Sequence, residues 1–169
     1  MTDGRPKYNM EAVTHPIAPV YNEESRILIL GSFPSVKSRE AMFFYGHPQN
    51  RFWRVLAKVF SSDVPISVDE KKDFLLSNGI AVWDVIASCE IIGSSDSSIK
   101  NAVPNDITDI LSKSKIKRII LNGGTAFKYY EKYLIKNIST EAVCLPSTSP
   151  ANAKWSIDML ALEWGKYLK

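Results

Sequence analysis

The sequence predicts an α/β fold, a three-layer α/β/α sandwich around a central, mainly parallel sheet of four strands. Four strand-like segments alternate with helix-like segments along the 169 residues, and residues 27–30 form an unbroken apolar run. A run without polar alternation is typical of a strand that is buried on both faces, as in a parallel sheet covered by helices. The length suits a single domain over 1–169, with an irregular N-terminal lead-in over 1–22.

The expected elements follow one another in a regular order. Strands are expected at 26–33, 80–86, 116–122 and 141–145, and helices at 50–60, 68–77, 105–112, 125–136 and 154–168. The first helix carries its apolar residues on one stripe and its Arg and Lys residues on the opposite face. The third helix follows Pro104, with Asn105 or Asp106 as its possible cap. The serine-rich residues 93–98 are expected to form a long loop after the second strand.

The composition excludes several classes of protein. Lys and Arg number 21 against 18 Asp and Glu, and a net charge of +3 does not by itself indicate a nucleic-acid partner. Cys89 and Cys144 lie in or beside apolar runs, so we expect two buried, reduced thiols rather than a disulfide. There is no signal-peptide core and no apolar run of roughly 20 residues, so we expect a soluble cytoplasmic protein without a membrane partner.

The predicted strands end in small and polar residues, and these ends meet at one edge of a parallel sheet. They deliver the turn 31–35, Asp84, Asn122 and the loop 146–150, which reads Pro-Ser-Thr-Ser-Pro. Ligands of open parallel sheets bind at this edge. No Walker-type or dinucleotide glycine motif and no His/Cys metal spacing is present, so neither a metal nor an organic cofactor is expected. Asp84 either orients a group of the site or caps a turn.

The proline-bracketed loop at 146–150 has two interpretations. Its small residues offer hydroxyl and backbone N–H donors on a stiff tip, which suits the phosphates of a nucleic acid. The same residues are also common in an ordinary turn that leads into a helix with a serine cap. The sequence of the loop alone does not decide between them.

An aromatic and polar segment follows the first turn. Residues 43–53 read Phe-Phe-Tyr-Gly-His-Pro-Gln-Asn-Arg-Phe-Trp, and residues 31–35 read Gly-Ser-Phe-Pro-Ser. Together they resemble the first motif of the uracil-DNA glycosylase superfamily, above all in its mismatch-specific uracil/thymine branch. That branch has a Gly-x-Asn-Pro-Gly turn, an aromatic residue and then His-Pro-x-Asn-Arg-Phe-Trp at the same offset. The loop 146–150 stands where the second motif of the superfamily, which enters the minor groove, is expected.

Phe33 departs from the pattern of the mismatch branch. That branch carries a water-handling Asn at this position, and other branches carry Asp or Glu, whereas a phenyl ring neither donates nor accepts the hydrogen bonds that hold a water molecule. The sequence therefore argues against ordinary uracil excision, and its motifs resemble those of the hypoxanthine-DNA (deoxyinosine) glycosylases. This resemblance implies a monofunctional enzyme that starts base-excision repair by hydrolysing deaminated adenine from DNA, with Asn50 as the catalytic candidate.

Excision of a base from duplex DNA requires a pocket that receives the flipped nucleotide. The catalytic candidates are Asn50, His47 and Ser32, and the candidates for binding the base are Gly31, Phe33, Pro34, Ser35, Phe44, Tyr45 and Asn122. The candidates for contacting DNA are Lys37, Ser38, Pro146, Ser147, Thr148, Ser149, Pro150 and Lys154. The expected partner is double-stranded DNA that contains a deaminated base, bound by a monomer near the nucleoid.

Each of these candidates also has a purely structural interpretation. Asn50 suits the cap of the helix at 50–60 as well as it suits catalysis. Tyr45 either stacks on the base or packs in the core. His47 either donates to the base or to a phosphate, or is a structural histidine fixed by Pro48. The lysines either contact phosphates or are solvated surface residues.

Other functions compete with hypoxanthine excision. A glycosylase for uracil, xanthine or a G:U/T mismatch would share the chemistry and differ in the base released. A non-catalytic module would bind damaged duplex and release no base. A nucleoside hydrolase on the same scaffold would cleave free inosine, and its binding would depend little on salt.

Overall fold

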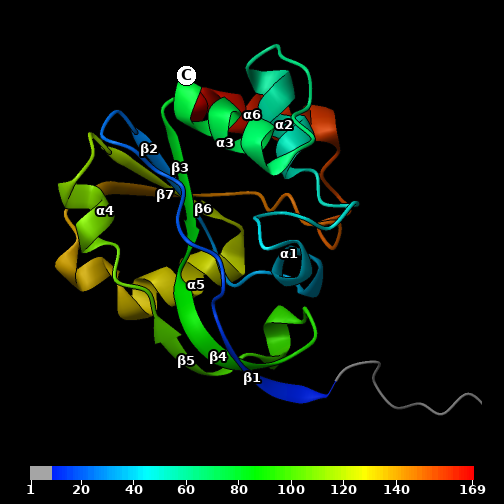
Figure 1. Cartoon of the computed structure of the whole chain (residues 1–169), viewed down its shortest axis with the longest axis vertical. Helices are drawn as coiled ribbons and strands as arrows, with labels where there is room; N and C mark the ends of the chain where they lie inside the picture. The colour runs from blue at the N-terminus through cyan, green and yellow to red at the C-terminus, as the bar shows by residue number, and fades with distance from the viewer. Residues whose placement is uncertain (1–8) are drawn as a thin grey trace, which may run out of the picture.

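A computed structural model describes residues 9–169 of the chain (Figure 1). Its centre is a parallel sheet with the strand order β3-β2-β6-β7. These strands are β2 (Ile27–Gly31), β3 (Ile80–Asp84), β6 (Arg118–Asn122) and β7 (Glu141–Leu145). Ile29 of β2 lies opposite Val82 on one side and Ile120 on the other. The predicted four-stranded sheet is thus confirmed.

The two faces of the sheet contribute to two separate hydrophobic clusters. Ile29 belongs to one cluster, and its neighbours Leu28 and Leu30 belong to the other. Because side chains alternate along a strand, the unbroken apolar run of β2 supplies both clusters, and all three side chains are fully buried. The three-layer architecture follows directly from this double burial.

Helices cover both faces of the sheet, as Figure 1 shows. On one side lie α2 (Phe52–Val59), α3 (Val68–Ser77) and α6 (Ile157–Leu168), with α2 packed against α6. On the other side lie α4 (Thr108–Ser112) and α5 (Gly124–Tyr133). The short α1 (Val36–Ala41) follows the turn after β2, and two 3-10 turns are η1 (Asp96–Ser98) and η2 (Ile135–Asn137).

A second, antiparallel sheet was not predicted. Its order is β1-β4-β5, from β1 (Met10–Thr14), β4 (Ile86–Ile92) and β5 (Lys100–Pro104). The irregular lead-in expected over 1–22 is therefore wrong at β1, while residues 1–8 lie outside the described residues. Most side chains of β1 are exposed, so the strand has no apolar pattern of its own and forms by pairing with β4.

Several element boundaries differ from the prediction. The second predicted strand divides into β3, which ends at Asp84, and β4, which begins at Ile86 and belongs to the other sheet. The helix expected at 105–112 is reduced to α4. Asn105 is buried instead of capping, since its Nδ2 donates to the Asp84 carbonyl at 2.9 Å, and Asp106 accepts from the Thr108 N–H. The C-terminal helix begins at Ile157, after its cap Ser156.

The two cysteines do not share one environment. Cys89 is buried, as expected, but Cys144 is exposed, so that expectation is wrong for Cys144. Cys144 lies on β7, which is an edge strand of the parallel sheet as far as residues 9–169 show. Among the described helices, none combines the length and the apolar character that a membrane span requires.

Candidate active site

One cavity of about 280 Å³ lies at the carboxyl ends of the parallel strands. It is lined by Gly31, Ser32, Phe33, Pro34, Ser35, Ser38, Phe44, Tyr45, His47, Asn50, Asp84, Ser94, Asp96, Asn122, Ser147, Thr148, Ser149 and Pro150. The sequence-predicted turn, the aromatic segment and the proline-bracketed loop therefore converge on a single site. Three predicted residues, Lys37, Pro146 and Lys154, do not line it.

A buried threonine links the two asparagines of the cavity. The Thr148 backbone N–H donates to Asn122 Oδ1 at 3.0 Å, and Asn122 Nδ2 donates to the Thr148 hydroxyl at 3.0 Å. That hydroxyl donates to Asn50 Oδ1 at 2.9 Å, and the Phe52 N–H donates to the same oxygen at 2.9 Å. Since a backbone N–H can only donate, the two backbone bonds fix which end of each amide is oxygen.

This relay determines what Asn50 can do. Its Oδ1 accepts two hydrogen bonds, and its Nδ2 has no hydrogen-bond partner within residues 9–169. This geometry fits both interpretations of Asn50 that the sequence offers. It satisfies the first N–H of α2 at Phe52, and it lines the cavity with a free N–H₂ donor. Asn122 binds Thr148 with both ends of its amide and thereby holds the loop against β6.

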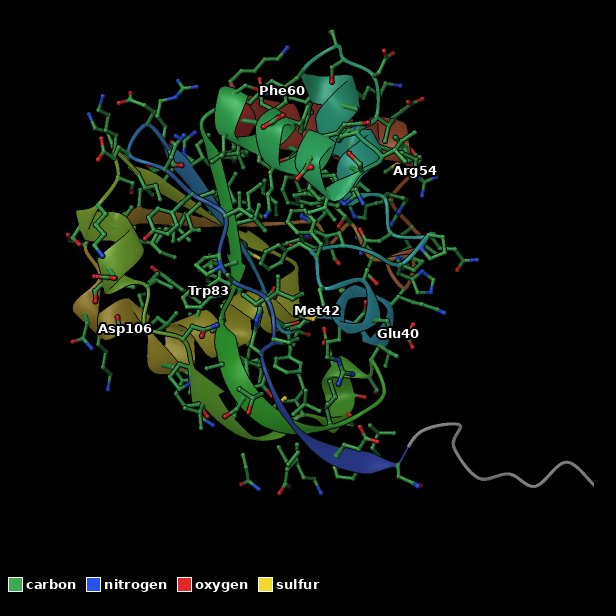
Figure 2. All side chains as sticks on the ribbon, viewed as in Figure 1. Glu40, Met42, Arg54, Phe60, Trp83 and Asp106 are labelled. Carbon is green, nitrogen blue, oxygen red and sulfur yellow. The ribbon has the colours of Figure 1, made fainter. Side chains whose placement is uncertain are left out.

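Arg51 fixes the same loop from the other side. Its guanidinium donates to the backbone carbonyls of Ser149 at 2.8 Å and Asn152 at 3.0 Å, and also to that of Trp155. The helical pattern places Arg51 on the basic face of this helix together with Arg54 and Lys58. Arg54 points outward, as Figure 2 shows, and Lys58 is exposed, whereas Arg51 is half-buried. The bidentate reach of an arginine explains why this position stiffens the loop.

Tyr45 combines core packing with a position at the cavity. Its backbone is left-handed, with φ 54°, and its ring stacks on Phe52 with centroids 3.9 Å apart. One ring face is thus covered, and the residue borders the cavity. Its hydroxyl is buried without a hydrogen-bond partner in the described part of the chain. Burial raises the pKa of Tyr45, with the Asp84 charge as a further cause and the Asn122 amide opposing both, so the hydroxyl stays protonated.

Two aspartates also line the cavity. Asp84 ends β3, and its Oδ2 lies 2.7 Å from Nε2 of His15. Asp96, in the serine-rich loop, accepts a hydrogen bond from Ser32 Oγ at 3.1 Å. Burial raises the pKa of the Asp96 carboxyl, the bond from Ser32 lowers it, and the Asp84 charge raises it again. The Ser32 hydroxyl, a catalytic candidate in the sequence, is engaged with this carboxylate.

Some of the remaining candidate residues lie at the cavity, and others only support the surrounding structure. Ser38 is 2% exposed and accepts from the Gly46 N–H at 3.0 Å, so it is buried scaffold and not a surface for DNA. Phe44 is buried in the core beside the cavity. His47 lines the cavity and accepts from the Gln49 N–H through Nδ1. Lys37 is exposed and lies 3.6 Å from Glu40.

Sequence reasoning left out three residues that matter here. His15 lay in the supposed lead-in, Asp96 in a loop without a motif, and Arg51 on a basic helix face to which no role was assigned. Asp84 could be found from the sequence because it stands at the carboxyl end of a predicted strand, where ligands of parallel sheets bind. Nothing local marks His15, because its partner lies 69 positions away.

A sheet edge with two glycosylase-like motifs around one cavity defines a class of protein, the DNA glycosylases with a site at the ends of parallel strands. The chain belongs to the uracil DNA glycosylase superfamily, whose family model matches residues 18–165. The predicted membership and the predicted fold are both confirmed. DNA is accordingly its partner.

Individual relatives narrow the comparison. The chain is 35% identical over 139 residues to a protein of Methanosarcina acetivorans named hypoxanthine DNA glycosylase, covering 81% of this chain and 87% of that one. It is 31% identical over 137 residues to a protein of the same name from Methanosarcina barkeri, covering 80% and 86%. A candidate uracil DNA glycosylase of M. acetivorans, solved by NMR, superposes with a TM-score of 0.80 at 31% identity, covering 94% and 97%.

Proposed function

We propose that this chain is a hypoxanthine DNA glycosylase, which flips deoxyinosine out of duplex DNA and hydrolyses its N-glycosidic bond with water. The observation that carries the proposal is the Asn50 amide, whose N–H₂ group is directed by two hydrogen bonds to be the free end at the cavity. The names of the two Methanosarcina relatives support the choice of base. Phe33 supports it further, since the turn offers no side chain that binds water at this position.

Each cavity residue has a separate role in excision. Tyr45 offers a ring face for stacking, and base–aromatic stacking contributes roughly 1–3 kcal/mol per base. Asn50 Nδ2 donates a hydrogen bond to the departing purine as charge develops on it, in the manner of a preorganised oxyanion donor. His47, with Nδ1 occupied by the Gln49 N–H, offers Nε2 to the base or a phosphate.

DNA is held by the rim of the cavity. The loop 146–150 presents the Ser149 and Ser147 region toward the minor groove on a backbone that Arg51 has already fixed. Lys37 and Lys154 lie beyond the rim as exposed cations that contact phosphates, and each such contact adds a salt-sensitive contribution to binding. The enzyme acts as a monomer in the cytoplasm, on nucleoid DNA, and its abasic product enters base-excision repair.

The test is a base-release assay on duplex oligonucleotides that contain hypoxanthine, xanthine or uracil. We expect free hypoxanthine as the main product. Asn50→Asp keeps the shape and both accepted hydrogen bonds but replaces the free donor with an acceptor, so it should lower the single-turnover rate by about 100-fold or more. Asn50→Ala should cost a similar factor and about 1 kcal/mol of stability through the lost helix cap.

The matched control is Gln49→Ala, an exposed neighbour on the same segment. It should leave the rate unchanged. A folded Asn50→Asp variant with wild-type activity would contradict the donor role. Release of uracil but not hypoxanthine would contradict the proposed substrate, and binding of inosine duplex without any base release would indicate a non-catalytic module.

A further inference from the structure

A buried histidine–aspartate pair borders the deep end of the cavity. The side chains of His15 and Asp84 are 3% and 5% exposed, and His15 Nε2 lies 2.7 Å from Asp84 Oδ2. The Ile17 N–H donates to His15 Nδ1 at 3.2 Å. Because that N–H can only donate, Nδ1 carries the lone pair and Nε2 carries the proton. His15 therefore donates to Asp84 Oδ2, and it lies outside the family match at 18–165.

The other oxygen of Asp84 is left for the cavity. A Cβ atom placed on Gly31 would lie 2.4 Å from Asp84 Oδ1 and 3.1 Å from the Tyr45 hydroxyl, so both oxygens converge over this glycine at the cavity wall. Oδ1 accepts no hydrogen bond from any residue in the described range. Asp84 lines the cavity, and its Oδ1 is not among the fully buried atoms without a partner, so this oxygen is open to the cavity and can accept a hydrogen bond from a ligand.

The pair is held rigidly. The His15 ring packs against the rings of Phe33 at 5.9 Å, Phe44 at 6.1 Å and Trp83 at 6.2 Å, measured between centroids. Trp83 in turn donates its Nε1–H to the Ile17 carbonyl at 3.2 Å, and Figure 2 shows Trp83 beside this N-terminal segment. His15 cannot turn away, and its fixed N–H keeps Asp84 Oδ1 directed at the cavity.

We propose that His15 is a positioning residue that makes Asp84 the reader of an N–H group on the flipped base. The inference rests on the proposed function and adds the chemical basis of its specificity. Asp84 is 4% exposed at the deep end, so it meets the base, while the sugar stays attached to the strand at the mouth. Its pocket-facing oxygen acts only as an acceptor.

The deaminated base fits this polarity and the normal base does not. Hypoxanthine carries an N1–H beside its C6 carbonyl, whereas adenine has an unprotonated N1 beside an amino group. Hypoxanthine N1–H donates to Asp84 Oδ1, while adenine held in the same position brings its N1 lone pair against the carboxylate and has to shift before its amino group can donate. The charge on Asp84 also disfavours a base that leaves as an anion, which makes the donor at Asn50 Nδ2 necessary on another edge of the purine.

Three variants test the inference in the full chain. In Asp84→Asn the His15 N–H still binds the side-chain oxygen, so the amide N–H₂ faces the base and the polarity is reversed. His15→Leu removes the positioning N–H, and His15→Gln keeps an N–H group that can reach Asp84. The double variant His15→Leu/Asp84→Asn avoids a buried unpaired carboxylate and serves where His15→Leu does not fold.

Three readouts separate base reading from a structural role. These are single-turnover release from inosine duplex, inhibition by free hypoxanthine compared with free adenine, and affinity for a duplex with a tetrahydrofuran abasic site. Asp84→Asn should lose about 100-fold in release and should lose the preference for free hypoxanthine, because a site built to bind an N–H discriminates strongly by it. His15→Leu should lower the release rate about 10-fold and weaken the preference for free hypoxanthine, and His15→Gln should restore most of both.

Affinity for the abasic duplex should stay unchanged in all variants, because that duplex has no base to read. Retained hypoxanthine preference in Asp84→Asn, or a matching loss of affinity for the abasic duplex, would overturn the inference. A wild-type chain that releases no hypoxanthine would instead overturn the proposed function, and binding of free hypoxanthine would then still report on the Asp84 carboxylate.

Discussion

Two groups of residues at the cavity are built in different ways and present opposite kinds of hydrogen-bonding group. The motif wall, defined as Asn50, Thr148 and Asn122, is a neutral relay of amides and a hydroxyl that ends in a free N–H₂ donor. The strand wall, defined as His15 and Asp84, is a buried pair that ends in a free acceptor. A pocket that presents a free donor and a free acceptor at fixed positions distinguishes bases by the order of the complementary groups on their edges.

The walls also differ in how they depend on the rest of the fold. The motif wall joins the start of α2 to the end of β6 through a loop clamped by Arg51. The strand wall joins the second sheet to the end of β3, since His15 directly follows β1. Damage to one wall should therefore leave the other intact, and the following variants separate them.

The largest effect is expected where the strand wall meets the turn, at Gly31. A methyl group there would lie 2.4 Å from Asp84 Oδ1 and 3.1 Å from the Tyr45 hydroxyl, so Gly31→Ala must displace both. A displacement of this size should lower single-turnover base release by about 100-fold. The control is Gly124→Ala, where a Cβ atom meets nothing within 4 Å and the rate should not change. Equal rates of base release in Gly31→Ala and Gly124→Ala would show that Asp84 and Tyr45 need no fixed position.

An intermediate effect is expected in the motif wall, at Thr148. Thr148→Val keeps the volume of this fully buried side chain and removes the hydroxyl between Asn122 and Asn50. The Asn50 amide then loses one of the two donors that orient it, so base release should slow by about 10-fold, with affinity for DNA retained. Thr148→Ser restores the hydroxyl and should restore the rate. If the valine and serine variants behave alike, the relay does not act through Asn50.

The smallest effect is expected at the hydroxyl of Tyr45, between the walls. Burial raises its pKa above the ordinary value of 10.0, so the folded chain keeps this proton at pH values where the unfolded chain loses it. This difference costs nothing below pH 10 and lowers the stability of the folded chain progressively above it. Tyr45→Phe should remove that part of the alkaline loss in urea unfolding measured from pH 9 to 11, and should change base release only a few-fold, because the stacking ring remains.

The contrast between the walls also marks what could be predicted from the sequence. The parallel sheet was predictable because β2 is apolar on both faces, and the motif wall because its two motif segments are contiguous runs of characteristic residues. β1 was not predictable, since an exposed edge strand that forms by pairing carries no pattern. The contact between His15 and Asp84 depends on that pairing, so no local signal marks it.

Two further residues show the same limit of local sequence patterns. Ser38 follows the turn in sequence and was expected to contact DNA, but the start of α1 turns it inward to bind the Gly46 N–H. Arg51 follows the helical period of a basic face to which no role was assigned, and its long side chain reaches the carbonyls of a loop about 100 residues away. Periodicity gives the direction of a side chain on its own helix and does not show what the rest of the chain places there.

The most direct measurement is chromatographic identification of the base that the wild-type chain releases from duplexes containing inosine, adenine or uracil in single-turnover conditions. A cavity lined by both a free amide donor and a free carboxylate acceptor predicts free hypoxanthine from the inosine duplex, no adenine from the otherwise identical normal duplex, and little uracil. Release of uracil faster than hypoxanthine, or of adenine at a comparable rate, would contradict the assignment of these two walls to a deaminated purine.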